Sequence, residues 1–224
     1  MRPRSREPEL LDAPLHDPRE LAHSLDQVAQ VNRWLGGARS LRRHLGALVA
    51  TGHVHVLDVG TGNGTTLREL ESWAEDRRAT WHAVGVELSP QSAALARNSG
   101  TRTVIADALR LPFADDAFDV ALCTLTLHHF SDDDAVVLLK EMARVSRRSV
   151  LVSDLERSTP NYWGARLLAA TLWRGNRLTR HDGPLSVRRS FTVGELLEIG
   201  RRAGLRSPAV RRHIPWRIVL EGRP

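Results

Sequence analysis

The sequence predicts an α/β fold in which a parallel sheet is covered by helices on both faces. Three observations support this prediction. From residue 53 onwards, segments with the pattern of strands alternate with segments with the pattern of helices. Several of the strand segments are apolar along their whole length, as expected of strands that are buried on both faces. The first strand runs directly into three alternating glycines, in "VLDVGTGNG" at residues 56–64.

The composition is that of an ordinary globular chain. It has 224 residues, of which 42% are hydrophobic and 26% charged, enough for one sizeable core. The single cysteine, Cys123, excludes an internal disulfide and a multi-cysteine metal cluster, and we expect no metal. No apolar stretch is long enough for a membrane span, and we expect a cytoplasmic location. The polar, proline-rich first dozen residues are expected to be loosely ordered.

Two helices are predicted ahead of the sheet. Residues 18–35 carry leucines and valines at helical spacing, and Gly36 and Gly37 end this helix. A second helix follows at residues 38–50. We therefore divide the chain into an N-terminal helical cap, residues 1–50, and an α/β domain, residues 51–224.

The alternating region and the segments after it can be assigned in order. The predicted strands are 53–60, 80–88, 101–107, 118–127 and 149–154, and the predicted helices are 65–76, 89–99 and 131–146. The alternation stops at residues 158–190, which we interpret as a lid insertion with a polar loop at 179–190. A helix at 192–204 and strands near 207–214 and 216–222 complete the chain. Because only Pro215 separates these strands, we expect an antiparallel hairpin at the sheet edge.

The glycine-rich turn after the first strand predicts a ligand site. In open parallel sheets, ligands bind beyond the carboxyl ends of the strands. One glycine suffices for a tight turn, so three favour a ligand that approaches the backbone closely. The spacing G-x-G-x-G differs from the dinucleotide fingerprint, and Asp58 would repel a diphosphate.

At these residues the chain resembles the class I S-adenosylmethionine-dependent methyltransferases. "LDVGTGNG" followed by "VGVELS" is similar to their cofactor-binding half, over roughly residues 54–155. The similarity is to the small-molecule group that includes the ubiquinone/menaquinone-biosynthesis methyltransferases. It implies a doubly wound, seven-stranded, mostly parallel sheet of order 3-2-1-4-5-7-6 with the last strand antiparallel. It also implies S-adenosyl-L-methionine as cofactor and S-adenosyl-L-homocysteine as its product.

The resemblance assigns the cofactor contacts by position, at the ends of four strands and on the first helix. They are Asp58, Gly60, Thr61, Gly62 and Gly64 around the methionyl group, Glu87 at the ribose hydroxyls, Leu88, Asp107 and Ala108 at the adenine, Thr124 and Leu125 beneath the sulfonium, and Arg33 with Asn32 toward the carboxylate. An acidic residue such as Asp58 suits a cofactor that carries a cationic amine and a sulfonium.

His128 and His129 are the candidate catalytic residues, because they follow the fourth strand, where the family's substrate pocket opens. Imidazole titrates near neutrality, which suits the deprotonation of a phenol or an enol. We expect His128 to face the pocket and His129 to be structural, although either could instead only bond a neighbouring loop. The candidate acceptor contacts in the lid are Tyr162, Trp163, His181, Asp182 and Arg188. Each of them could equally pack or pair within the lid.

The sequence thus predicts an enzyme of secondary metabolism that methylates a small hydrophobic acceptor, as a monomer or homodimer. The favoured target is the oxygen of a hydroxylated aromatic, polyketide-like or quinone-like compound. Carbon methylation is a close alternative, because a phenolate reacts at either atom. An RNA methyltransferase that uses the basic C-terminal third is a further alternative, and a cofactor-binding regulatory module is another. Although the net charge is +6, arginines and carboxylates alternate along the chain, so nucleic acid is not the expected partner.

Overall fold

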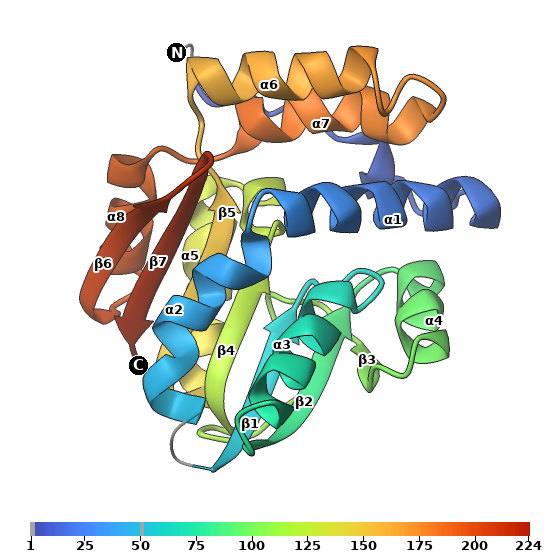
Figure 1. The fold of residues 1–224 in the computed structure, drawn as a ribbon. Helices are drawn as coiled ribbons and strands as arrows, with labels where there is room; N and C mark the ends of the chain where they lie inside the picture. The colour runs from blue at the N-terminus through green and yellow to red at the C-terminus, as the bar shows by residue number, and fades with distance from the viewer. Residues whose placement is uncertain (1–2, 50–51) are drawn as a thin grey trace.

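A seven-stranded sheet forms the centre of the structure, a computed structural model that describes residues 3–49 and 52–224 (Figure 1). The strand order is β3-β2-β1-β4-β5-β7-β6, which confirms the expected order. Strands β1 to β5 are parallel, and β7 is antiparallel to both of its neighbours. The strands are β1 (His53–Val59), β2 (Thr80–Glu87), β3 (Thr103–Ile105), β4 (Phe118–Thr124), β5 (Ser146–Leu155), β6 (Arg206–His213) and β7 (Arg217–Arg223).

Helices cover both faces of this sheet, as the apolar strands predicted. Helices α2 (Gly37–Val49) and α3 (Thr65–Glu75) share one apolar cluster with β1, β4 and β5. Helices α5 (Asp132–Val145) and α8 (Val193–Arg202) share a second cluster with the opposite faces of the same strands. Every residue of β4 is buried, which explains why its sequence shows no polar alternation. The short helix α4 (Pro90–Asn98) packs beside β2 and β3.

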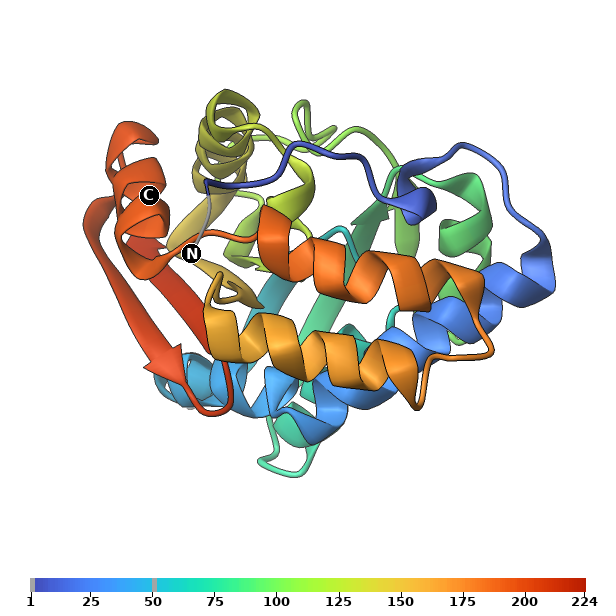
Figure 2. The same ribbon diagram turned by 90° about the horizontal axis from the view of Figure 1, so that it is seen from above.

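A third layer lies across the carboxyl ends of the strands (Figure 1). It consists of α1 (Pro18–Trp34), α6 (Thr159–Ala170) and α7 (Arg177–Arg189), with α6 and α7 side by side in the view from above (Figure 2). The prediction of a polar loop at 179–190 was wrong. Asn176 caps a helix there, and its apolar residues Leu178, Leu185 and Val187 are buried. The many polar side chains of this segment and Pro184 led to the prediction of a loop instead of a helix.

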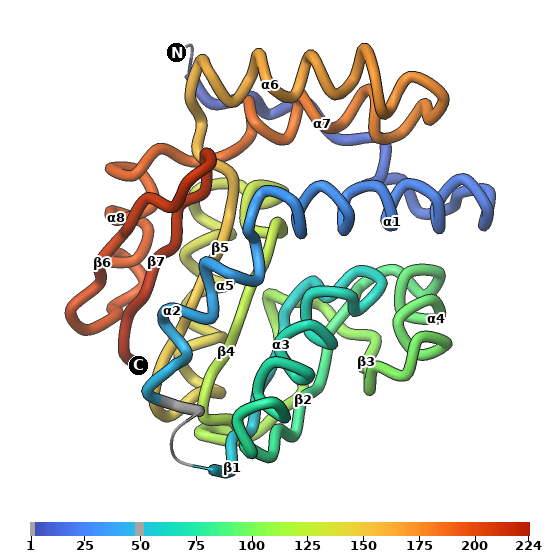
Figure 3. Tube along the Cα trace, in the orientation of Figure 1, coloured from blue at the N-terminus to red at the C-terminus, as the bar shows by residue number. Residues whose placement is uncertain are grey.

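The N-terminal segment is ordered, contrary to expectation. Residues 4–16, which we name the strap, run beside α7 and lead through η1 (Leu10–Asp12) to α1 (Figure 3). The backbone N–H groups of Leu10 and Leu11 donate to the Asp182 carboxylate at 2.8 and 2.9 Å. The backbone of His16 is bonded to the Gln91 side chain on α4. Partners on α7 and α4, far away in the sequence, therefore hold the strap in place.

The division into a cap and an α/β domain and the cytoplasmic location both stay predictions. The boundary between the cap and the α/β domain falls at residues 50 and 51, outside the described residues, as does the last residue of the predicted helix 38–50. Within the described ranges, no helix combines the length and the apolar character needed to cross a bilayer.

Candidate active site

A cavity of about 650 Å³ lies between the carboxyl ends of the strands and the third layer. Its volume is in the usual range for small-molecule sites. Strands β1, β2, β4 and β5 contribute the residues at or just beyond their ends, among them Gly60, Glu87, Leu125 and Leu155. The strap closes it with residues that include Glu9. Four parallel strands thus present their ends to one enclosed space.

The glycine turn after β1 forms one end of this cavity. Gly60 and Gly62 both have positive φ, +75° and +57°. A Cβ on Gly60 would lie 2.3 Å from the Thr126 side chain, whereas a Cβ on Gly62 would meet only Leu25, at 4.0 Å. Gly60 is therefore required by packing. Gly62 keeps a bare backbone on the wall of the cavity.

Asp58 supports this turn from beneath and does not line the cavity. Its Oδ2 atom accepts a hydrogen bond from the Thr61 hydroxyl at 2.9 Å, and its Oδ1 atom has no partner among the described residues. Burial raises the pKa of Asp58 to about 6. Thr61 and Gly64 likewise lie outside the cavity wall, where Gly64 caps the N-terminus of α3.

Glu87 and its neighbours form the adjoining wall. One carboxylate oxygen of Glu87 accepts the N–H of Gly62 at 2.9 Å, and the other accepts the N–H of Ser89 at 3.0 Å. Burial raises the pKa of this carboxyl group, while the backbone donors oppose the shift. Leu88, Asp107 and Ala108 continue the wall. A carboxylate fixed beside a bare backbone and an apolar side chain can bind a polar ring system with hydroxyl groups.

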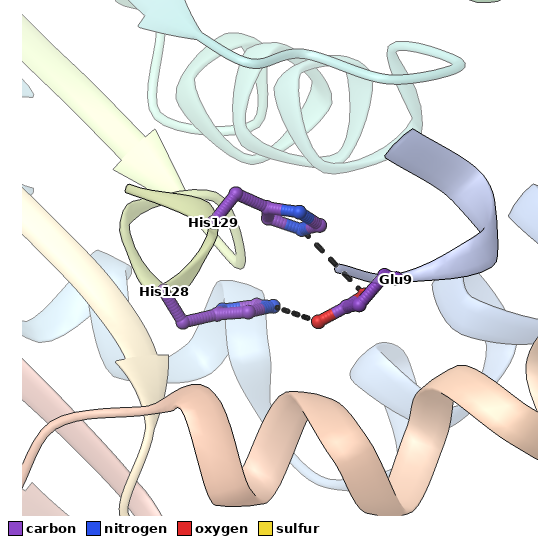
Figure 4. A group of neighbouring side chains, drawn as sticks. All are labelled: Glu9, His128 and His129. Atoms are coloured by element: carbon purple, nitrogen blue, oxygen red, sulfur yellow. Dashed lines mark ion pairs between the residues drawn. The ribbon is translucent and has the colours of Figure 1, made fainter. Parts of the chain in front are cut away.

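Beyond the end of β4, His128 lies between two carboxyl groups. It belongs to the short helix η2 (Leu127–His129), which follows β4. Its Nδ1 atom is 2.8 Å from Oδ1 of Asp154, and its Nε2 atom is 3.5 Å from Oε1 of Glu9 (Figure 4). Burial would raise the pKa of Asp154, but His128, the backbone N–H of Leu155 and the charge of Arg217 together lower it. Burial raises the pKa of Glu9 to about 7.

His129 and Arg189 complete this cluster. The His129 Nδ1 atom is 2.7 Å from Oδ1 of Asp12, and its Nε2 atom is 3.8 Å from the other Glu9 oxygen. Arg189 donates to the backbone carbonyls of His128 and His129 at 3.2 and 2.7 Å. Its Nε atom also lies 3.8 Å from Oε1 of Glu9. Arg189 therefore fixes the turn that carries both histidines.

Glu9, His128 and His129 are the group among the described residues that could hold a metal ion. Their ligand atoms lie within 4.8 Å of one another. Carboxylates also hold both Nδ1 atoms, as they do around metal-binding histidines. However, the Arg189 guanidinium already places a fixed positive charge beside Glu9. The expectation of no metal therefore stays a prediction.

Comparison with known proteins identifies the central part of the chain. A family model described as "Methyltransferase domain" matches residues 57–152. Residues 57–152 form a methyltransferase domain. It resembles the class I domain of quinone-biosynthesis methyltransferases, as the glycine motif indicated. A demethylmenaquinone methyltransferase of Roseiflexus sp. (strain RS-1) is 36% identical over 117 residues, or 52% of this chain and 47% of that protein.

Other relatives carry the same domain. The probable tRNA methyltransferase 9B of Homo sapiens is 33% identical over 91 residues, or 40% of this chain and 18% of that protein. The chain thus spans less than half the length of these curated relatives. A solved structure of a SAM-dependent methyltransferase from Aquifex aeolicus matches with a TM-score of 0.65 and 15% identity, over 93% of this chain and 98% of that one. At this identity the likeness shows the fold.

Some of the predicted cofactor contacts lie away from the cavity. Arg33 is turned outward and pairs with Glu69 at 2.5 Å. Its neighbour Asn32 lines the cavity, and the Asn32 Oδ1 atom is buried without a hydrogen-bond donor among the described residues. Thr124 is buried in β4 outside the cavity wall, whereas Leu125 lines the cavity with a φ of +53°.

Of the five predicted lid contacts, only Asp182 lines the cavity, and its carboxylate holds the strap. Tyr162, Trp163, His181 and Arg188 lie outside the cavity wall. The register of α6 turns Gly164, Ala165 and Leu168 inward and leaves Trp163 64% exposed. Arg188 points away from the cavity and lies 3.6 Å from Glu7 of the strap.

Three residues of the site were missed in the sequence. Asp154 ends an apolar strand as Asp58 does, so its position was a usable signal. No sequence signal indicated Glu9, because this residue lies in a polar segment that is far along the chain from the first strand. Arg217 lines the cavity at the start of β7 and is 2% exposed. Its position just after Pro215 suggested only a hairpin.

Proposed function

We propose that the chain is an S-adenosyl-L-methionine-dependent methyltransferase that acts on a small hydrophobic acceptor. The favoured target is the oxygen of a hydroxylated aromatic, polyketide-like or quinone-like compound. The observation that carries this proposal is that the glycine turn and Glu87 share one cavity with His128, whose ring Asp154 holds. The relatives named demethylmenaquinone methyltransferase support a quinone-like acceptor.

The residues of the cavity fit the cofactor. When bound, it supplies a methyl group on an electrophilic sulfonium. The bare backbone of Gly62 leaves room for the methionyl chain, and Glu87 offers its remaining lone pairs to the ribose hydroxyls. Leu88 offers an apolar surface to the adenine. Asn32, which lines the same cavity, would contribute a polar side chain beside the methionyl group.

His128 would act as the base. Because Asp154 holds the Nδ1–H group, Nε2 is left as the acceptor for the proton of an acidic hydroxyl. The Asp154 carboxylate then stabilises the imidazolium that forms. Such a base contributes about 10²–10⁴-fold, and alignment of the nucleophile with the methyl group supplies much of the rest. The same deprotonation would serve carbon methylation, because a phenolate or enolate reacts at either atom.

An RNA acceptor is the second candidate, because the chain is similar to a tRNA methyltransferase over 91 residues. The charges favour the small molecule. Several arginines of the last third meet carboxylates, including Arg202 with Asp133 and Arg212 with Glu156. Such paired arginines offer little net charge to a phosphate backbone.

Methyl-labelled cofactor incubated with the protein and a cell extract would test the proposal. We expect the label in the organic phase, where mass spectrometry and NMR identify the product and the methylated atom. His128→Asn should abolish this label, whereas His82→Asn, an exposed histidine outside the cavity, should not. Label that stays aqueous until ribonuclease treatment would contradict a small-molecule acceptor.

A further inference from the structure

Arg217 is a buried guanidinium in the wall of the cavity. It is 2% exposed, and its Nε and Nη1 atoms have no hydrogen-bond acceptor among the described residues. Most buried donors in folded proteins have a partner, and a buried charge without one is strongly destabilising. A guanidinium that lines the cavity and has no ion-pair or hydrogen-bond partner among the described residues points to an anion that binds there.

No carboxylate among the described residues forms an ion pair or a hydrogen bond with the Arg217 side chain. Asp154 is the one carboxylate whose charge acts notably on Arg217. Its oxygens are already bound by the His128 ring and by the backbone N–H groups of His128 and Leu155. Burial lowers the pKa of Arg217 to about 10, so the guanidinium keeps its charge at neutral pH.

The position of Arg217 in the sheet associates it with the base. In the antiparallel pairing of β5 with β7, Arg217 lies opposite Leu155, the residue after Asp154. Three strand spacings, about 14 Å, separate β7 from β1 and its glycine turn. Arg217 thus lies near Asp154, which holds the His128 ring, and three strands away from the glycine turn.

We propose that Arg217 binds an ionised oxygen of the acceptor, and that the acceptor is an apolar acid which also carries the hydroxyl or enol that faces His128. The planar guanidinium matches a carboxylate with two parallel hydrogen bonds. The inference rests on the proposed function and specifies its substrate class. It gives the cavity two polar anchors, a cation at β7 and a base at η2, within otherwise mostly apolar walls.

Two matched probes test this assignment. 4-Hydroxybenzoate carries the charge, and its methyl ester lacks it. Binding of each is measured by calorimetry in the presence of saturating S-adenosyl-L-homocysteine. We expect the wild type to prefer the acid by about tenfold or more, the worth of a charge-assisted hydrogen bond. Arg217→Gln should remove this preference, and Arg217→Lys should keep part of it. A wild type without the preference, including one that binds neither probe, would overturn the proposal.

The cofactor contains a carboxylate too, so a second experiment measures the affinity of the protein for the cofactor product. S-adenosyl-L-homocysteine should bind Arg217→Gln within about twofold of the wild type. A loss of tenfold or more would place the cofactor carboxylate on Arg217 and overturn the assignment. So would a marked fall in the Tm of Arg217→Gln, because it would make the guanidinium structural. A protein that binds the acid but transfers no methyl group would contradict the proposed function alone.

Discussion

His128 Nδ1 lies 2.8 Å from Asp154 Oδ1, and the two side chains are only 3% and 1% exposed. The backbone N–H of His128 donates to the second Asp154 oxygen at 3.1 Å. One carboxylate on β5 therefore fixes both the backbone and the ring of a residue that follows β4. This leaves Nε2, which faces Glu9 in the cavity wall, as the ring nitrogen that Asp154 does not hold.

Asp154→Asn should lower kcat by about 10²-fold or more, because the amide no longer stabilises the imidazolium or holds the reactive tautomer. Cofactor affinity should stay within about twofold, since Asp154 lies away from the glycine turn. Steady-state kinetics and calorimetry with S-adenosyl-L-homocysteine measure the two quantities. His128→Asn combined with Asp154→Asn should be no worse than His128→Asn alone. Additive losses would show that the two residues do not act as a unit.

Glu9→Gln should flatten the pH dependence of stability. Burial raises the pKa of Glu9 from 4.5 to about 7, so the folded protein holds this proton more tightly than the unfolded chain. The resulting stabilisation is fully present below about pH 4.5 and is lost as the pH rises through 7. The neighbouring His129 and Arg189 lower this pKa, and Asp182 raises it.

Urea unfolding of the wild type and Glu9→Gln at pH 4.5, 6 and 8 measures this effect. The wild type should lose up to about 3 kcal/mol more than the variant across the range. Asp58, whose pKa is also raised, titrates in both proteins and cancels in the comparison. Parallel curves would mean that Glu9 is ionised in the folded protein throughout.

The two glycines that begin the turn after β1 should respond differently to alanine. Gly60→Ala should destabilise the fold by about 2 kcal/mol or more, because φ is positive and the new Cβ would lie 2.3 Å from Thr126. Gly62→Ala has space for its Cβ, so only the strain of about 1 kcal/mol is expected, together with weaker cofactor binding.

Urea unfolding and cofactor titration separate these effects. Gly46→Ala is the matched control, because Gly46 is an exposed residue of helix α2 with nothing within 4 Å of the new Cβ. It should stabilise the protein by up to about 1 kcal/mol and leave cofactor binding unchanged. Equal effects of Gly60→Ala and Gly62→Ala on both measurements would contradict the division of roles.

Most helices and strands could be predicted from the sequence, because their hydrophobic periodicity is a local property that does not depend on distant residues. The apolar β4 and the alternation around it predicted a covered parallel sheet, and the family resemblance supplied its order. Helix α7 was not predicted, because its buried face is only partly apolar. Gly183 on that helix is needed for contact with the Trp173 ring, which would lie 2.3 Å from a Cβ. The adjacent Gly183 and Pro184 therefore predicted a loop, although tertiary packing stabilises a helix in this segment.

The residues of the candidate site likewise divide into those that local motifs predicted and those that depend on distant contacts. The glycine turn and Glu87 follow from motifs, and His128 follows from its place after a strand. Glu9 reaches the histidines because distant residues hold the strap, among them Asp182, which is 172 and 171 residues away from Leu10 and Leu11. Arg217 reaches the cavity only because β7 inserts between β5 and β6. No local pattern encodes either contact.

Removal of metal ions should leave methyl transfer unchanged. Arg189 already places a positive charge beside Glu9, and burial raises the Glu9 pKa to about 7, so the cluster offers a cation little net negative charge. Activity after dialysis against a chelator, and elemental analysis of the purified protein, measure this. A near-stoichiometric metal, or an activity that only a divalent cation restores, would contradict the expectation and make the two histidines ligands.

Asp182→Ala should release the strap. The substitution leaves the N–H groups of Leu10 and Leu11 without their acceptor, at a cost of about 1–3 kcal/mol for each group that stays buried. The strap should then open to water, and Glu9 should leave His128. Hydrogen exchange of residues 4–16 should accelerate by about tenfold or more, and methyl transfer should fall. Arg188→Gln is the control, because this exposed pair with Glu7 contributes little. If both variants exchange at the wild-type rate, contacts other than Asp182 hold the strap, and the Glu9 carboxyl group would stay in place without it.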